Sequence, residues 1–361
     1  MIDRKRHRFW LSLVGILGIL IGVTVWLFVE QLSPLRSGDV LFYDEEKIWL
    51  LNPSDYSLSL MVDMARAGFT IGGDVHASPD HDHLYLTAQR STGDPKDEPL
   101  LLLQYDLRGK DLQVILDTPG LSRMSPIFPG GKHAIVMIDS PDWPDPKAIT
   151  TTCVLEFATG DCLPIGKDIP YIDINEELWL SEDTLVTSDY RDAHNIYVLS
   201  LDRGKFSLKQ ALTRPDLDFS TVEMDILSDH RVILAPYRSD GFQYIFLSLD
   251  LDSLEWADLP FVPTNYGARI NDVSVSSDAC YVGYGAGLNF EVKELCSGRT
   301  VAALYNVLHS SWIRDTDSIV MYVEHFDYPG DPDELVVLDA STGQTQTILT
   351  LDHQVWFETV P

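Results

Sequence analysis

A unit made of a strand, a polar turn and a second strand recurs six times in this sequence, and this repeat limits the fold more than any other feature. Successive copies are separated by 38 to 53 residues. Their anchor positions are Ser78, Phe128, Ser181, Ser228, Ser276 and Arg314. Periods of about 40 to 50 residues with four strands each are typical of propeller blades. Since no segment after residue 30 keeps a helical period, the sequence predicts an all-β chain, a β-propeller of four-stranded blades.

The two ends of the repeat region predict one further blade. Residues 40–62 contain three strands with no first strand before them, whereas residues 355–360 resemble a single first strand. Pairing both ends in one sheet would close the ring and remove two exposed edges. We therefore expect seven blades over residues 39–361, closed by the strand at 355–360. A six-bladed ring is the alternative, because the unit around Glu176 has the weakest pattern, and an open array of β-sandwiches is another.

Two turn motifs carry a resemblance to a known group of propellers. Ser78-Pro79-Asp80 follows a predicted inner strand, and a Leu-Asp-x-x-Thr-Gly turn occurs at residues 338–343. This pattern resembles the TolB-like and WD-repeat-like β-propellers over most of residues 37–361. The resemblance implies a periplasmic or extracellular propeller that binds proteins, peptides or small ligands in its central funnel. It fixes no reaction, because one fold carries many functions.

The first 38 residues do not share the repeat. A basic tail at residues 1–8 precedes an uncharged apolar run at residues 9–29, and residues 30–38 form a polar linker. About 21 apolar residues suffice to span a bilayer as a helix. Basic residues before the run orient the amino terminus in the cytoplasm. We expect a transmembrane signal anchor with the propeller outside the cytoplasm; a cleaved signal peptide and a buried helix are the alternatives.

The charge of the chain excludes one class of partner. The sequence has 26 Lys and Arg against 55 Asp and Glu, a formal net charge of −29. Without residues 1–36, which hold five basic and two acidic residues, the net charge is −32. So acidic a surface would repel phosphate backbones, and we expect no nucleic-acid partner.

Polar residues on the predicted first strands are candidates for the lining of the central channel. These candidates for ligand binding are His76, Arg123, Glu177, Asp225, Asp272, His309 and Glu358. Alternation along a strand makes the choice sensitive to register, because a shift of one residue turns half of the side chains away from the channel. Such a ring could bind a cation or a basic peptide, or hold ordered water.

A second candidate is an acidic loop at residues 327–334. It offers carboxylates, the oxygen ligands that calcium prefers, at Asp327, Asp331, Asp333 and Glu334, although without the spacing of an EF-hand loop. Calcium is therefore the cofactor to test, and a solvated turn is the alternative.

The four cysteines form two local pairs that an oxidising compartment could bridge. Cys280 and Cys296 flank a hairpin whose centre near residue 288 would place them opposite each other. For Cys153 and Cys162, a hairpin centred near 159.5 places Cys162 opposite Phe157 instead. The sequence thus favours the bridge between Cys280 and Cys296, with buried free thiols as the alternative for both pairs.

No catalytic residue can be assigned from the sequence. A Gly-x-Ser-x-Gly elbow, a His-Glu-x-x-His motif, a Walker loop and a dinucleotide fingerprint are all absent from it. We therefore expect a membrane-anchored propeller that binds a protein, a peptide or another ligand as a scaffold. A metal-dependent hydrolase or lactonase-like enzyme with its site in the channel is the alternative.

Overall fold

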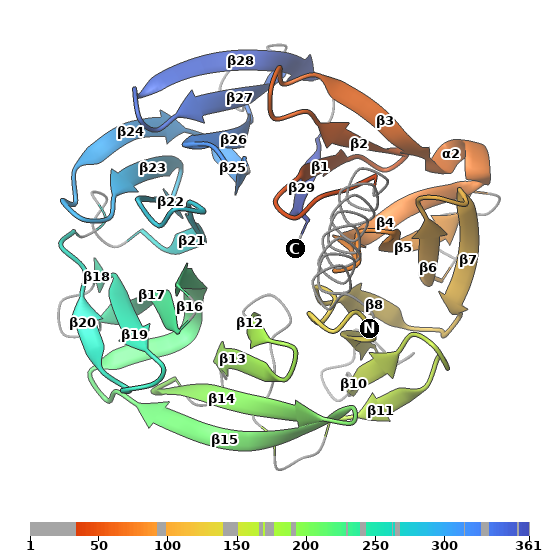
Figure 1. Cartoon of the computed structure of the whole chain (residues 1–361), viewed down its shortest axis with the longest axis horizontal. Coiled ribbons are helices and arrows are strands. Elements are labelled where there is room, and N and C mark those ends of the chain that lie inside the picture. The colour runs from red at the N-terminus through yellow and green to blue at the C-terminus, as the bar shows by residue number, and fades with distance from the viewer. Residues whose placement is uncertain are drawn as a thin grey trace, which may run out of the picture.

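The computed structural model describes residues 34–91, 99–139, 151–165, 169, 177–188, 193–228, 230–238, 243–261, 263, 268–313, 315–325, 332–351 and 354–360. Within these residues the strands form seven antiparallel sheets arranged as blades around a centre (Figure 1). The all-β propeller predicted from the repeats is confirmed, and the six-bladed alternative is wrong. The unit with the weakest sequence pattern forms a complete blade, β12 to β15.

Each blade has four consecutive strands from the centre outward, except the first, which combines both ends of the chain. Blade 1 holds β29 (Trp356–Thr359), β1 (Val40–Tyr43), β2 (Lys47–Leu51) and β3 (Leu58–Asp63). Blade 2 holds β4 (Phe69–Ala77), β5 (His83–Arg90), β6 (Leu101–Asp106) and β7 (Asp111–Leu116), and a short helix, α2 (Met64–Ala67), leads into it. Blade 3 holds β8 (Leu121–Met124), β9 (His133–Ile138), β10 (Thr151–Glu156) and β11 (Cys162–Pro164).

Blades 4 to 7 follow in chain order. Blade 4 holds β12 (Glu177–Ser181), β13 (Thr184–Ser188), β14 (Asn195–Asp202) and β15 (Lys205–Thr213). Blade 5 holds β16 (Leu217–Ser228), β17 (Arg231–Arg238), β19 (Leu247–Asp250) and β20 (Trp256–Asp258), with β18 (Gln243–Tyr244) beside β17. Blade 6 holds β21 (Ile270–Val275), β22 (Tyr281–Ala286), β23 (Asn289–Glu294) and β24 (Thr300–Tyr305). Blade 7 holds β25 (Val307–Trp312), β26 (Ser318–Val323), β27 (Asp333–Asp339) and β28 (Gln344–Leu351).

The core of the molecule lies between the blades. In β1, Val40 and Phe42 pack on blade 7, whereas Leu41 and Tyr43 pack on blade 2. Successive side chains of a strand point to opposite faces, so a strand buried on both faces must be apolar at every position. This explains why the predicted strands are continuous apolar runs. Among the described residues, a buried cluster fills each junction between neighbouring blades.

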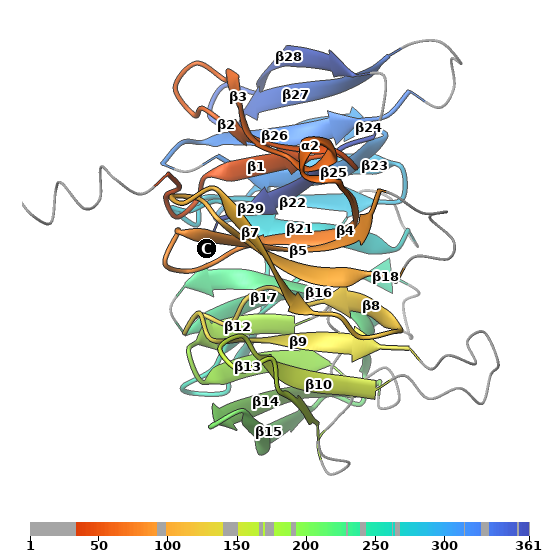
Figure 2. The ribbon, with the colours of Figure 1, turned by 90° about the vertical axis from the view of Figure 1, so that its right-hand side faces the viewer.

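The strand order creates two different rims. One rim holds the turns that join the first strand of a blade to the second and the third to the fourth, and we call it the turn rim. Residues 34–39 and Val360 also lie there, where the Gly38 amide donates to the Val360 carbonyl at 2.6 Å. Figure 2 shows both of these ends on the same side of the ring. We call the opposite rim, with the second-to-third strand connections and the connections between blades, the loop rim. The strand bounds put the longest connections there.

The predicted membrane anchor at residues 9–29 lies outside the described residues. In the part of the chain that the structure describes, no helix has the length and apolar character needed to cross a membrane.

Candidate functional site

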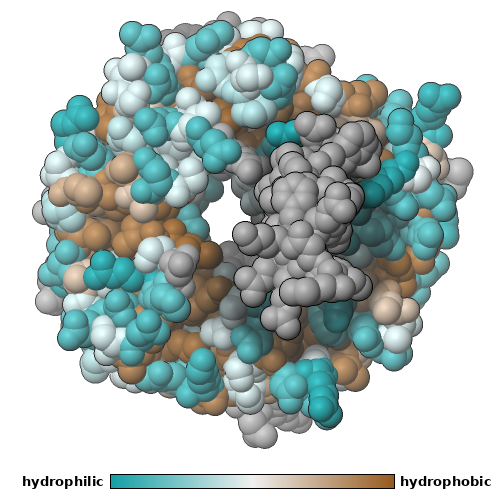
Figure 3. Space-filling view, viewed as in Figure 1, coloured by the Kyte–Doolittle hydropathy of each residue, from teal (hydrophilic) through white to brown (hydrophobic). Residues whose placement is uncertain are grey.

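All seven candidate channel residues lie on the innermost strands, one in each blade. Figure 3 shows an opening at the centre of the ring, viewed from the turn rim. The contacts of these side chains decide whether they face a ligand or hold the blades together.

His76 on β4 and Glu358 on β29 link blade 2 to blade 1. His76 Nδ1 lies 3.1 Å from Glu358 Oε1, and His76 Nε2 lies 3.3 Å from the Met124 carbonyl oxygen. Burial lowers the pKa of His76, but the charge of Glu358, its hydrogen bond and the charge of Asp74 outweigh burial and raise this pKa to about 9. The imidazole is therefore charged at neutral pH and is already paired.

Asp225 on β16 and Asp272 on β21 link the next blades in the same manner. Asp225 Oδ2 accepts the Val275 amide at 2.6 Å, and Asp272 Oδ2 accepts the Ser310 hydroxyl at 2.8 Å. Burial raises the pKa of each carboxyl to about 6. Asp74 on β4, which sequence reasoning missed, makes the equivalent link, since its Oδ2 accepts the Met124 amide at 3.0 Å.

The other three channel candidates lie on β8, β25 and β12. Arg123 is exposed on β8, and His309 on β25 is half-buried with its ring 6.4 Å from that of Phe357. Burial lowers the pKa of His309. Glu177 begins β12, and its side chain lies outside the described residues. In the described parts of the chain, no group of three His, Cys, Asp or Glu side chains could hold a metal ion.

The acidic loop is described only in part. Asp327 and Asp331 lie outside the described residues, so the calcium site stays a prediction. Asp333 accepts the Tyr322 hydroxyl at 2.5 Å and the His325 amide at 3.1 Å, and Glu334 lies 3.6 Å from His325 Nε2. These two carboxylates therefore already have partners at the start of β27.

The sequence favoured the wrong one of the two cysteine pairs. The structure contains a disulfide between Cys153 and Cys162, with Cα atoms 5.6 Å apart, whereas Cys280 and Cys296 are free and exposed. The reason is register: Leu155, not Phe157, pairs with Cys162, so the hairpin is shifted by two residues and brings Cys162 diagonally next to Cys153. The other hairpin pairs Tyr281 with Glu294, so its register continues from Cys280 to Leu295 rather than to Cys296.

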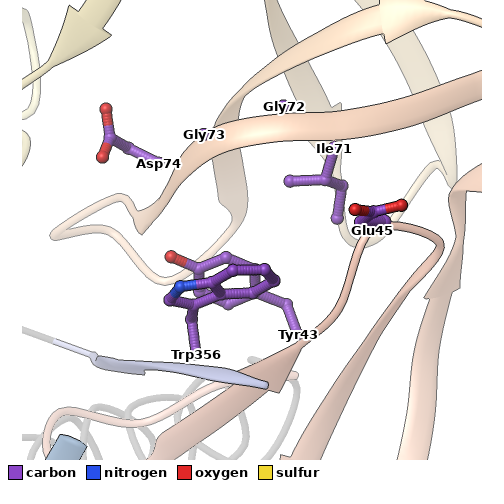
Figure 4. A pocket seen from close by; sticks show the side chains of 7 residues that line it. All are labelled: Tyr43, Glu45, Ile71, Gly72, Gly73, Asp74 and Trp356. Atoms are coloured by element: carbon purple, nitrogen blue, oxygen red, sulfur yellow. The ribbon is translucent and has the colours of Figure 1, made fainter. Parts of the chain in front are cut away.

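A pocket on the loop rim, at the junction of blades 1 and 2, combines aromatic and acidic side chains (Figure 4). We call it the rim pocket. Its volume is about 370 Å³. The residues that line it are Tyr43, Glu45, Ile71, Gly72, Gly73, Asp74 and Trp356.

Two rings form one wall of the rim pocket. Tyr43 and Trp356 are register partners on β1 and β29, which places both side chains on the same face of the sheet. Their ring centroids are 5.9 Å apart with an angle of 24° between the planes. Tyr43 is buried and Trp356 is half-buried, so the indole is the more accessible ring. Burial, with the charges of Glu358 and Asp74, raises the pKa of the Tyr43 phenol.

The opposite wall is backbone, because Gly72 and Gly73 lie in an irregularity of β4. The pairing with β5 is interrupted between Ile71 and Val75. A Cβ atom at Gly73 would lie 2.5 Å from the Oγ1 of Thr87, which is fully buried. Only glycine permits this close approach, and the irregularity carries Asp74 to the rim pocket.

A second cavity, of about 290 Å³, lies on the turn rim between blades 4 and 5. Its lining includes a cation, Lys209, and a carboxylate, Asp252, together with His230. His230 Nδ1 and Asp252 Oδ1 are 3.6 Å apart, and Lys209 places a cation in the same lining as Asp252. The rim pocket, whose described lining has carboxylates but no cation, is the stronger candidate.

Comparisons with known proteins identify the fold and no more. No protein-family model and no curated protein matches this chain. Among solved structures, an oligogalacturonate lyase in complex with manganese is similar, with a TM-score of 0.56 and 11% identity over 88% of this chain and 87% of that one. Prolyl oligopeptidase B from Galerina marginata is similar at a TM-score of 0.55 and 11% identity, over 93% of this chain but 53% of that one. TolB from Acinetobacter baumannii matches at a TM-score of 0.46 and 10% identity, over 88% of this chain and 65% of that one. The chain has the fold of β-propellers that serve varied functions.

Proposed function

We propose that this protein is a membrane-anchored, extracytoplasmic binding scaffold that presents the loop rim, with the rim pocket, to a protein or peptide partner. The proposal rests on where the rim pocket lies. The chain enters the propeller at one end of β1, and the rim pocket lies at the other end of this strand. Strand β1 runs from Val40 near the turn rim to Tyr43 at the rim pocket. An anchor before residue 34 would therefore hold the turn rim toward the membrane and leave the loop rim free.

The lengths of the connections support the same orientation. On the loop rim, the chain runs from Arg90 to Leu101 and from Ile138 to Thr151 between paired strands. On the turn rim, a single turn joins Asp202 to Lys205. Binding residues are often carried by long connections on a rigid scaffold, which favours the loop rim as the binding side.

Channel chemistry supports a scaffold more than an enzyme. Asp74, Asp225, Asp272 and His76 are used to link neighbouring blades. The described residues bring no set of side chains together for metal-dependent hydrolysis. The lactonase-like enzyme is therefore the second candidate.

Site-specific crosslinking tests the binding side. A photoreactive amino acid replaces Glu45 at the rim pocket or, as the matched control, Asp55 in the β2–β3 turn on the turn rim; both residues are exposed. In cells that produce the protein naturally, we expect a discrete crosslinked product from position 45 and none from position 55. Equal products from both positions, or none from position 45, would contradict the proposal.

The exposed thiols of Cys280 and Cys296 provide a test of the location. A membrane-impermeant maleimide, added after mild reduction to cells with an intact plasma membrane, should label the full-length chain. The double variant Cys280→Ser/Cys296→Ser should lose this labelling. Labelling that requires lysis of the cells would place the propeller in the cytoplasm.

A further inference from the structure

We propose that the rim pocket receives a cationic side chain, Lys or Arg, of the partner, held between the Trp356–Tyr43 wall and the carboxylates of Glu45 and Asp74. This inference rests on the proposed function and specifies which chemistry the partner must present. It rests on the arrangement of the residues that line the pocket.

The aromatic wall is suited to a cation. The Tyr43 and Trp356 rings are nearly parallel, at 24°, and the indole is partly accessible. A cation over the face of a tryptophan within about 6 Å of the ring centre is attracted by the negative face of the ring, and more strongly so where water is excluded. Figure 4 shows the two rings together on one side of the pocket, with Asp74 and Glu45 beyond them at opposite ends. A long, unbranched side chain that enters here would have its charge beside aromatic faces.

The carboxylates around this pocket outnumber the cation beside them. His76 pairs with Glu358 at 3.1 Å and also feels the charge of Asp74, so one cation faces three carboxylates: Glu358, Asp74 and Glu45. Glu45 is exposed, and it makes no hydrogen bond or ion pair with its side chain among the described residues. One oxygen of Asp74 accepts the Met124 amide, an uncharged donor. A cationic ligand would therefore supply the charge that the described lining lacks, whereas an anionic ligand would be repelled.

The same lining argues against a metal ion as the occupant. A hard divalent cation such as calcium takes six to eight oxygen ligands at close distances. Two carboxylates at opposite ends of the pocket, with two rings between them, do not form such a set, and no group of three ligating side chains occurs among the described residues. An ammonium or guanidinium group on an alkyl stem fits aromatic and acidic walls together.

The test uses five-residue peptides labelled with a fluorophore that differ only at the central residue, titrated with the full-length chain in a mild non-ionic detergent. The central residue is Lys, Arg, norleucine, acetyl-lysine or Glu. We expect the Lys and Arg peptides to bind at least about tenfold more tightly than the other three, with an affinity that falls as salt is added. Norleucine or acetyl-lysine peptides that bind as tightly as the Lys peptide would overturn the inference.

Variants of adjacent glutamates locate the binding. Glu45→Gln should weaken the Lys peptide about threefold, whereas Glu46→Gln, in the same turn but outside the pocket lining, should leave its affinity unchanged. Trp356→Leu should weaken it more than Trp356→Phe, which keeps an aromatic face, and thermal unfolding shows whether each variant is folded. Equal effects of Glu45→Gln and Glu46→Gln would show that binding lies elsewhere.

The outcomes separate the inference from the proposed function. If crosslinks form at position 45 but the Glu or norleucine peptide binds best, the scaffold function stands and the cationic ligand is wrong. If no peptide binds and no crosslink forms at position 45, both are wrong.

Discussion

At the residue scale, blade 6 contains a buried ion pair whose two charges are both removed from water. Lys293 Nζ lies 3.1 Å from Glu291 Oε2, and both side chains are at most 5% exposed. The Tyr284 hydroxyl donates to the same Glu291 oxygen at 2.8 Å, and Lys293 donates to the Thr300 hydroxyl at 2.8 Å. Every group in this network therefore depends on its neighbour, because an unpaired buried charge is strongly destabilising.

Removing one partner should reveal this dependence. Lys293→Met leaves Glu291 buried without its counter-ion, and we expect a loss of about 3–5 kcal/mol in the free energy of unfolding, measured by denaturant titration. Lys205→Met on the exposed strand β15 is the matched control and should change it by less than about 0.5 kcal/mol. Similar small effects at both positions would mean that water reaches Glu291.

The side chain of Asp272 has a different energetic role, which depends on pH. Its folded-state pKa of about 6 lies above the unfolded value of about 3.9, so its favourable contribution is present below pH 4 and is lost as pH rises through 6. Asp272→Asn keeps a hydrogen-bond acceptor, and Asn tolerates the positive φ of 55° at this position. The variant should gain about 1–3 kcal/mol at pH 7 and show a flatter pH dependence of thermal unfolding between pH 4 and 7. An unchanged slope would contradict the raised pKa.

At the scale of the element, the repeated sequence unit contains a turn between the first two strands of a blade, and side chains within the turn hydrogen-bond to it. Ser276 Oγ donates to Asp278 at 2.7 Å and accepts the Tyr281 amide at 2.9 Å, which closes the β21–β22 hairpin. Ser181 donates to Asp183 at 2.8 Å in blade 4. The spacing of serine and aspartate predicted where blades begin because this local geometry recurs whatever the surrounding packing.

The serine hydroxyls of these two turns should contribute unequally to the free energy of unfolding, because one is buried and the other is exposed. Ser276 is 3% exposed, whereas Ser181 is exposed. Ser276→Ala leaves the Tyr281 amide without its acceptor, and we expect a loss of about 1–3 kcal/mol, compared with about 0.5 kcal/mol for Ser181→Ala. Equal losses in chemical denaturation would show that water replaces the Ser276 hydroxyl.

Long-range register explains what the sequence could not predict. Blade number and strand positions follow from local patterns, and the channel candidates could be assigned to inner strands in advance. The partner of each side chain could not, because Asp225 finds Val275 only when two blades pack together. A shift of two residues in the β10–β11 hairpin was enough to reverse the cysteine prediction. The rim pocket was missed because Tyr43, Asp74 and Trp356 come from three distant parts of the chain.

At the scale of the whole molecule, stability depends on the closing of the ring. Strand β29 pairs with β1, so blade 1 joins the C-terminal end of the propeller to its N-terminal end. Phe357 packs edge-on against Phe42 within this blade, at 4.7 Å between ring centroids. Across the junction to blade 2, His76 and Glu358 form the polar contact that accompanies the closure. The same junction carries the rim pocket, so the closure and the proposed binding site depend on one interface.

Alkaline pH should therefore weaken the closed ring. The pKa of His76, about 9 in the folded chain against about 6.5 unfolded, gives stability that is complete below pH 6.5 and is lost as pH rises through 9. Glu358→Gln removes the largest cause that raises the pKa of His76, so this pKa should fall well below its value in the unaltered chain. We expect this variant to lose roughly 2–3 kcal/mol at pH 7 and to show little further loss from this histidine between pH 7 and 10. The exposed Glu255→Gln serves as the matched control and should follow the unaltered chain at every pH. A His76 titration by NMR near pH 6.5 in the unaltered chain would refute this account, because the histidine would then be neutral at pH 8 and the ring would close without the ion pair.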